Sequence, residues 1–160
     1  MSYCKKGNLN TKFDAHASPN AFNAAVDRIK LIGGTKKLNT ALRSVIDNMF
    51  VATAGVRVGV PKVLVLLVDN APVTGQETDL VEAAVRIAAK VRKLGIHIVM
   101  ISVKTDVRYF DLGSIAGNAA NVFMPRGYDE LVDIKTVRLV WEFILGLGKL
   151  CICLSLEYHY

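Results

Sequence analysis

Apolar residues along the chain alternate between helical spacing and unbroken runs. Ser18-Pro19-Asn20 combines a capping hydroxyl with an early proline, which indicates a helix start. Apolar residues then recur at helical spacing as far as Gly33-Gly34. A second helix is predicted from about 39 to 49 by the same spacing. The run from Val63 to Val68 is continuous and ends at Asp69-Asn70, which is typical of a buried parallel strand.

The second half of the chain continues this alternation. A helix is predicted over 77–94, with Gly95 as a stop just past its end, and a second buried strand over 96–103. A short helix at 111–115, a short strand at 121–124 and a helix from about 128 to 144 follow. Alternating strands and helices predict an α/β fold: a doubly wound, mostly parallel sheet with helices on both faces. The strand at 63–68 is predicted to be central in this sheet or next to a gap in it.

The length of 160 residues fits one domain, because domains typically run to about 100–150 residues. We assign residues 1–144 to this domain and residues 145–160 to a divergent C-terminal tail. Within the tail, Cys, Ile and Leu cluster after Gly146 and Gly148, so 150–156 is predicted to be extended rather than helical. A replacement strand of the sheet is the alternative for this segment.

Composition narrows the class of protein. A hydrophobic fraction of 52% suits a sheet buried on both faces and excludes a disordered chain. The net charge of +6 would allow a glycosaminoglycan, nucleic acid or anionic membrane surface as partner. The basic residues are scattered along the chain, however, so we interpret them as charges on solvated helix faces rather than as an anion-binding site. No nucleic-acid partner is therefore expected. A glycosaminoglycan-binding surface is an alternative that needs Arg86, Lys90 and Lys93 to act with Lys36 and Lys37.

Cysteines and terminal segments add little to this description. Three cysteines are too few for a disulfide framework, and Cys151 and Cys153 are expected to face opposite ways on a strand. A disulfide bond between Cys4 and one of these two cysteines is one alternative, and free thiols are the other. Met1 is followed by polar residues, so no signal peptide is expected. The apolar stretch 139–156 contains charged residues, so no membrane span is expected.

Asp69 is the main candidate for a functional side chain. In parallel sheets ligands bind at the carboxyl ends of the strands, where Asp69 follows the strongest strand; a turn or helix cap is the alternative. Gly33-Gly34-Thr35-Lys36-Lys37 has some likeness to a phosphate loop but lacks its full spacing, so a nucleotide- or phosphate-binding protein is the alternative function. No Cys-His or Ser-His-Asp constellation is apparent in the sequence, and we expect that the protein is not an enzyme.

Several segments together resemble one family. Residues 32–42 resemble the segment that carries the metal-binding threonine in von Willebrand factor type A domains and integrin I domains. Residues 55–69 resemble the family's loop and fourth strand, which ends on a metal-linked aspartate. The family's fifth strand and closing elements are matched by 95–103, 111–117, 121–123 and 128–131. Over about 10–134, the order and spacing are similar to extracellular-matrix members, such as collagen VI-like, matrilin-like and cochlin-like proteins.

The resemblance implies a Rossmann-like fold and a non-enzymatic, secreted adhesion module that binds a matrix or cell-surface protein within a longer parent protein. In this family an Asp-x-Ser-x-Ser motif after the first strand, a threonine and an aspartate hold a divalent cation, usually Mg²⁺. A carboxylate from the partner completes the shell. By position, Thr35 and Asp69 match the threonine and the aspartate.

The chain also departs from the family pattern. The family's first strand, first helix and most of its second strand would precede Tyr3, so residues 1–144 are expected to form a partial domain without Asp-x-Ser-x-Ser. Asp14-Ala15-His16-Ala17-Ser18 has a similar spacing, but a helix start follows it and Ser18 is interpreted as a cap. Two side chains hold Mg²⁺ loosely, so weak Mg²⁺ binding or none is expected. The missing strand is expected to leave an open seam unless the sheet closes in another way.

Overall fold

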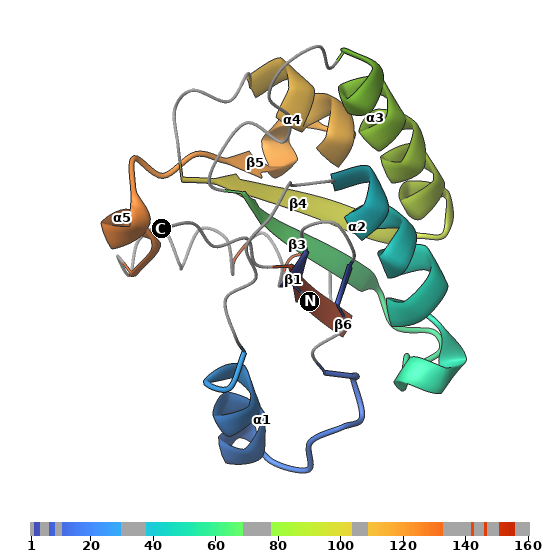
Figure 1. Ribbon diagram of the computed structural model, residues 1–160, viewed down its shortest axis with the longest axis vertical. Coiled ribbons are helices and arrows are strands. Elements are labelled where there is room, and N and C mark those ends of the chain that lie inside the picture. Colours follow the sequence, from blue (N-terminus) through green and yellow to red (C-terminus); the bar gives the residue numbers. More distant parts are fainter. Residues whose placement is uncertain are drawn as a thin grey trace.

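The main sheet consists of four parallel strands in the order β5-β4-β3-β6 (Figure 1). The computed structural model describes residues 2–3, 7–8, 11–29, 38–68, 78–103, 109–132, 142, 146 and 151–155. The strands are β3 (Lys62–Val68), β4 (Ile96–Ser102), β5 (Val122–Phe123) and β6 (Cys151–Ser155). A separate antiparallel pair joins β1 (Ser2–Tyr3) to β2 (Gly7–Asn8). The predicted parallel sheet is confirmed, with β3 inside it.

Helices alternate with these strands close to the predicted positions. They are α2 (Leu38–Ser44), which continues as the π-helix η1 (Val45–Met49), then α3 (Thr78–Lys93), α4 (Tyr109–Ala116) and α5 (Tyr128–Val132). Short 3₁₀ turns, η2 (Ala52–Ala54) and η3 (Ala119–Asn121), precede β3 and β5. Most of the predicted helix beyond α5 lies outside the described residues.

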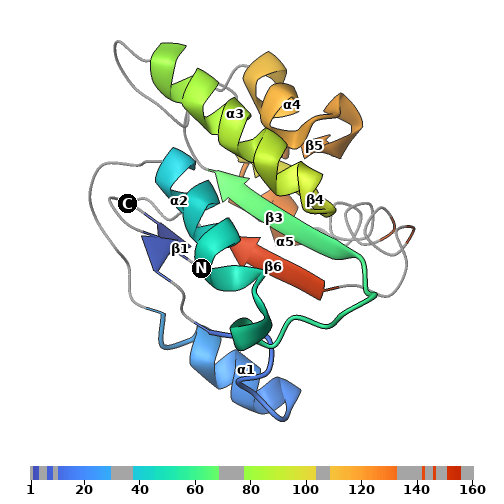
Figure 2. The ribbon, with the colours of Figure 1, turned by 90° about the vertical axis from the view of Figure 1, so that its right-hand side faces the viewer.

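The two faces of the sheet are buried under different helices. Leu64, Leu66 and Val68 of β3 belong to the larger core, which contains residues of α2, α3 and α4. Val63 and Val65, the alternate positions, belong to a smaller cluster that Leu131 of α5 also contacts. In Figure 2, α2 and α3 lie in front of β3, while α5 lies behind it. The prediction of helices on both faces is therefore confirmed.

The C-terminal strand β6 pairs with β3 on the side away from β4. It runs parallel to β3, with Cys151 level with Lys62 and Ser155 level with Leu66. The prediction of an extended segment is confirmed for Cys151–Ser155. These residues form an edge strand of the main sheet next to β3, and their interpretation as a replacement strand stays a prediction. The boundary between 144 and 145 stays a prediction.

The strand also corrects the expectation for its two cysteines. Cys151 and Cys153 occupy the register positions of Lys62 and Leu64. Alternate positions of a strand belong to the same face of the sheet, so the expectation that these two residues face opposite ways is wrong. Cys4 lies outside the described residues.

The N-terminal segment, residues 11–29, contains one helix, α1 (Pro19–Val26), which stands apart from the sheet (Figure 1). Ser18 is its N-cap, and its Oγ accepts a hydrogen bond from the N–H of Ala21 at 3.3 Å, as predicted. The helix was predicted to extend to Gly33-Gly34 but ends at Val26. None of its residues is buried, so no packing of an apolar face favours its extension.

Candidate functional site

The carboxyl ends of β3 and β4 meet at one edge of the sheet. Val68 is level with Ser102, and the N–H of Val103 donates to the Val68 carbonyl at 3.1 Å. Ser102 is completely buried at this edge and was not singled out from the sequence; its only signal is a polar residue at the end of an apolar run. Ligands of parallel sheets bind at such an edge, so the edge is the candidate site.

The two predicted metal-binding positions lie close in sequence to described elements that begin or end at this edge. Asp69 is the residue after Val68, and Thr35 is three residues before Leu38, where α2 begins. The start of α2 lies toward the arrowhead of β3 in both ribbon views (Figures 1 and 2). Thr35 and Asp69 themselves lie outside the described residues, so their place at this edge stays a prediction.

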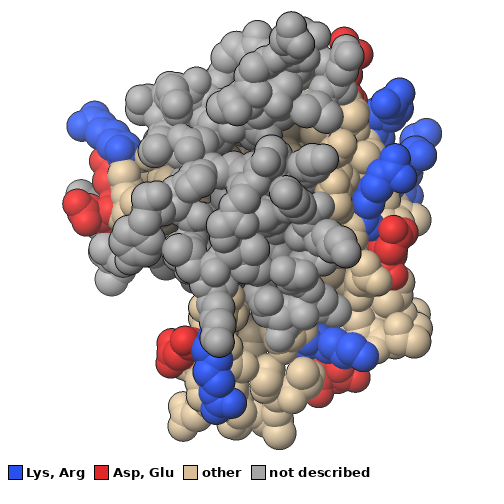
Figure 3. Space-filling model, in the orientation of Figure 1, with Lys and Arg blue, Asp and Glu red and all other residues tan. Residues whose placement is uncertain are grey.

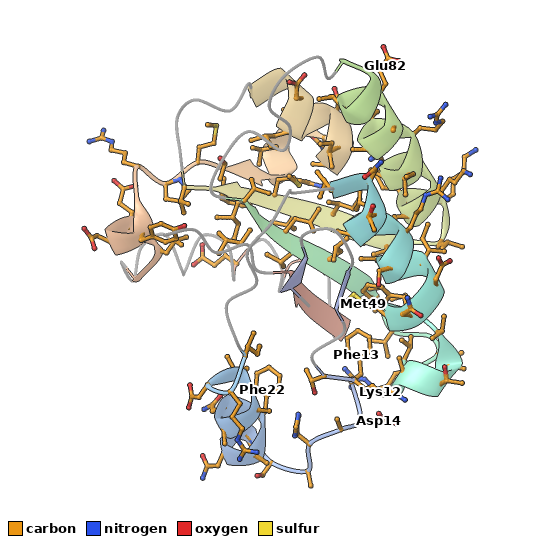
Figure 4. The ribbon with its side chains drawn as sticks, viewed as in Figure 1. Lys12, Phe13, Asp14, Phe22, Met49 and Glu82 are labelled. Carbon is orange, nitrogen blue, oxygen red and sulfur yellow. The ribbon has the colours of Figure 1, made fainter. Side chains whose placement is uncertain are left out.

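Asp14 lies at the opposite end of the molecule. The N–H of Phe13 donates to the Ala54 carbonyl at 2.9 Å, and Nζ of Lys12 donates to the Thr53 carbonyl at 3.2 Å. Figure 4 shows Lys12, Phe13 and Asp14 side by side at this end. Both carbonyls belong to η2, which precedes β3 in the chain. At about 3.3 Å per residue, β3 separates its amino end from Val68 by about 20 Å.

The structure shows where Asp14 and Ser18 lie, the two residues whose spacing is similar to that of the family's metal motif. Asp14 lies against Gly55, in the segment that leads into the amino end of β3, so its carboxylate is not at the carboxyl edge of the sheet. Ser18 is occupied as the cap of α1. Neither residue therefore lies at the candidate site, and the interpretation of Ser18 as a cap is confirmed.

Other metal donors do not gather in the described part of the chain. Within the described residues there is no group of three or more His, Cys, Asp or Glu side chains that could hold a metal ion. His16 is engaged locally, with Nε2 at 2.7 Å from Oγ1 of Thr11 and its ring at 6.0 Å from that of Phe22. The assignment of Thr35 and Asp69 as ligands stays a prediction from the family resemblance.

None of the described helices is both long enough and apolar enough to cross a bilayer.

Comparison with known proteins identifies the fold family. Residues 1–137 match the model of the von Willebrand factor type A domain. Three structures of proximal thread matrix protein 1 from the mussel byssus are similar to this chain. Crystal form 2 has a TM-score of 0.73 at 15% identity. The match covers 86% of this chain and 34% of the mussel protein chain. A second structure has a TM-score of 0.69 at 21% identity, with 86% and 32% coverage.

The third structure, of the same mussel protein with a zinc-occupied MIDAS motif, has a TM-score of 0.67 at 24% identity, again with 86% and 32% coverage. The chain thus spans about one third of the length of the mussel protein. At these identities the likeness concerns the fold. With a family match over most of its residues and the parallel sheet that this family has, the chain belongs to the von Willebrand factor type A domain family.

Proposed function

We propose that this chain is a non-enzymatic protein-binding module that serves adhesion or assembly in the extracellular matrix, as part of a longer secreted protein. The observation that carries the proposal is the family match over residues 1–137, since the family consists of protein-interaction and adhesion modules. The likeness to a byssal matrix protein supports the matrix setting. A matrix or cell-surface protein is the expected partner.

The carboxyl edge of β3 and β4 is the proposed binding site. There, the hydroxyl of Thr35 and the carboxylate of Asp69 would hold a hydrated Mg²⁺ ion. Mg²⁺ takes about six hard oxygen ligands and gives up water reluctantly, so two side chains bind it weakly. The cation would supply positive charge for a carboxylate of the partner. Asp14 and Ser18 lie elsewhere and add no ligand, so most of the binding energy would come from direct protein contacts.

Calorimetric titration with Mg²⁺ and Mn²⁺ tests the metal site. Binding is expected to be no tighter than about millimolar, and Asp69→Ala is expected to change it little, because the cation keeps most of its water. Asp14→Ala is the matched control, since it removes a carboxylate at the other end of β3. Micromolar binding that is lost in Asp69→Ala but kept in Asp14→Ala would contradict the proposed weak site.

Binding to an immobilised extracellular-matrix extract tests the module's function. We expect saturable binding that a chelator reduces by less than about twofold, because a weak cation contributes little. The same protein is titrated with ATP, the ligand expected if Gly33-Gly34-Thr35-Lys36-Lys37 were a phosphate loop. Micromolar ATP binding without matrix binding would reject the adhesion function in favour of a nucleotide-binding one.

A further inference from the structure

The last two turns of α3 carry a row of exposed cations. Arg86, Lys90 and Lys93 are exposed, and their spacing of four and three residues places them on one face of the helix. The opposite face is buried in the larger core through Ala84, Ile87, Ala88 and Val91. Figure 3 shows Lys and Arg side chains gathered along the upper right edge, where α3 lies in Figure 1. We call these three residues the α3 basic row.

The α3 basic row has no internal partner in the part of the chain that the structure describes. Arg86, Lys90 and Lys93 make no ion pair there, even though Glu82 lies one turn before Arg86. Arg92 behaves differently, because its Nη1 donates to the carbonyls of Ser114 and Ile115 at the end of α4. Cations near a helix C-terminus stabilise its dipole, by about 0.3–1 kcal/mol each. That effect leaves the three charges facing solvent and able to bind an anion.

The position of the row separates it from the carboxyl edge. The 16 residues of α3 run from Thr78, after the loop that follows β3, to Lys93, just before β4. At 1.5 Å per residue the helix is about 24 Å long, and the row spans about 10 Å of its final half. Figure 4 places Glu82 toward the first half of α3. A ligand on the row and a protein at the carboxyl edge would therefore bind opposite ends of the sheet.

We propose that the α3 basic row binds a linear sulfated polysaccharide. Three charges in line over about 10 Å match a chain with repeated anionic groups better than a single small anion. The helix contains no Phe, Tyr or Trp, so it lacks the aromatic platform on which single-stranded nucleic acid stacks. Its apolar face is already in the core and is not available for insertion into a membrane. The choice among polyanions also rests on the matrix setting of the proposed function.

Heparin serves as the probe of this proposal. The row variant Arg86→Gln/Lys90→Gln/Lys93→Gln is compared with Lys12→Gln/Arg28→Gln/Arg126→Gln, which removes the same net charge from exposed positions elsewhere. Circular dichroism checks that both variants fold. The Kd for heparin is measured at a series of NaCl concentrations.

The row variant is expected to raise the Kd at least about tenfold. It is also expected to lower the slope of log Kd against log[NaCl] by about two to three, because a complex with three fewer ionic contacts releases fewer counterions. The matched control is expected to change the Kd by less than about threefold, through net charge alone. Glu82→Gln removes the nearest acidic group on the same face and is expected to tighten binding about twofold. Equal losses in the two triple variants, or no heparin binding by the wild type, would overturn the proposal.

Two further arms decide the class of ligand and the relation to the adhesion function. Row-dependent binding to a single-stranded oligonucleotide or to anionic lipid vesicles that is tighter than to heparin would reject the sulfated polysaccharide. Heparin binding is expected to persist in a chelator and in Asp69→Ala. Heparin binding without matrix-extract binding would reject only the adhesion module, and the reverse result would reject only the polysaccharide site.

Discussion

The α/β body and the N-terminal segment 11–29 are held in place by different interactions. In the body, β3 and β4 bury apolar side chains on both faces, and Leu64, Ile98 and Met100 are completely inaccessible to solvent. In the N-terminal segment, α1 has no buried residue. The body is therefore stabilised mainly by apolar burial, and the segment by a few local contacts.

Those local contacts are concentrated on η2 and the residue after η1. The rings of Phe13 and Phe50 have centroids 5.4 Å apart, and Phe13 packs against the larger core. The backbone of Phe13 and the ammonium group of Lys12 bond to carbonyls of Ala54 and Thr53. The segment is anchored at its start, while α1 extends beyond the anchor. We expect substitutions to have global effects in the body, intermediate effects at the anchor and local effects in α1.

The largest effect is expected in the body. Leu64→Ala should lower the free energy of unfolding by about 2–5 kcal/mol, because it opens a cavity between β3 and the helices above it. Phe22→Ala removes a larger side chain, but Phe22 is 41% exposed in α1, so a loss below about 1 kcal/mol is expected. Urea unfolding of both variants measures the contrast. Comparable losses would mean that α1 shares the stability of the body.

An intermediate effect is expected at the anchor, where Asp14 lies against Gly55. Gly55 has a φ of 78°, and a Cβ there would come within 2.5 Å of Cγ of Asp14 and 2.6 Å of its Cβ. Gly59 in the same loop has a φ of 73° but nothing within 4 Å of such a Cβ. Gly59→Ala should therefore cost only the left-handed backbone strain, about 1–2 kcal/mol. Gly55→Ala should cost about 1–2 kcal/mol more, because the anchor must shift.

A double-mutant cycle with Asp14→Ala isolates the contact between these residues. In the Gly55→Ala background, Asp14→Ala removes the carboxylate but still leaves a Cβ at residue 14, so about half of the extra loss in stability should return. Asp14→Gly should return nearly all of it. Equal costs for Gly55→Ala and Gly59→Ala in urea unfolding would show that residue 14 does not lie on Gly55 in solution.

The elements of the body could be predicted from the sequence because burial enforces their pattern. The run from Val63 to Val68 lies between buried faces, so its apolar residues are continuous and its limits are visible in the sequence. The end of α1 could not be predicted, because Ile29 continues the apolar spacing where no packing exists to extend the helix. The spacing of apolar residues thus predicts the limits of an element where those residues pack in a core.

The partner of β3 and the candidate site were harder to predict, for a different reason. The composition of Cys151–Ser155 indicates an extended segment, but pairing with β3 joins residues far apart in the sequence and leaves no local signal. At the site, the carboxyl edge follows from the alternation of strands and helices. The roles of Thr35 and Asp69 follow only from the family resemblance, and the assignment of these ligands stays a prediction.

The smallest effect is expected at the cap of α1. Ser18→Ala removes the hydroxyl that accepts from the Ala21 N–H, which typically costs a helix about 0.5–1 kcal/mol. Because α1 buries no residue, this loss should stay within the helix and leave the urea midpoint of the body unchanged. Amide hydrogen exchange within Pro19–Val26 should become about two- to fivefold faster, while β3 amides keep their protection. Ser18→Asp, which restores an N-cap acceptor, is the control and should return exchange to the wild-type rate. A lower midpoint for the body in Ser18→Ala would show that the two regions unfold together, and that the anchor at Phe13 couples them more strongly than the contacts described above imply.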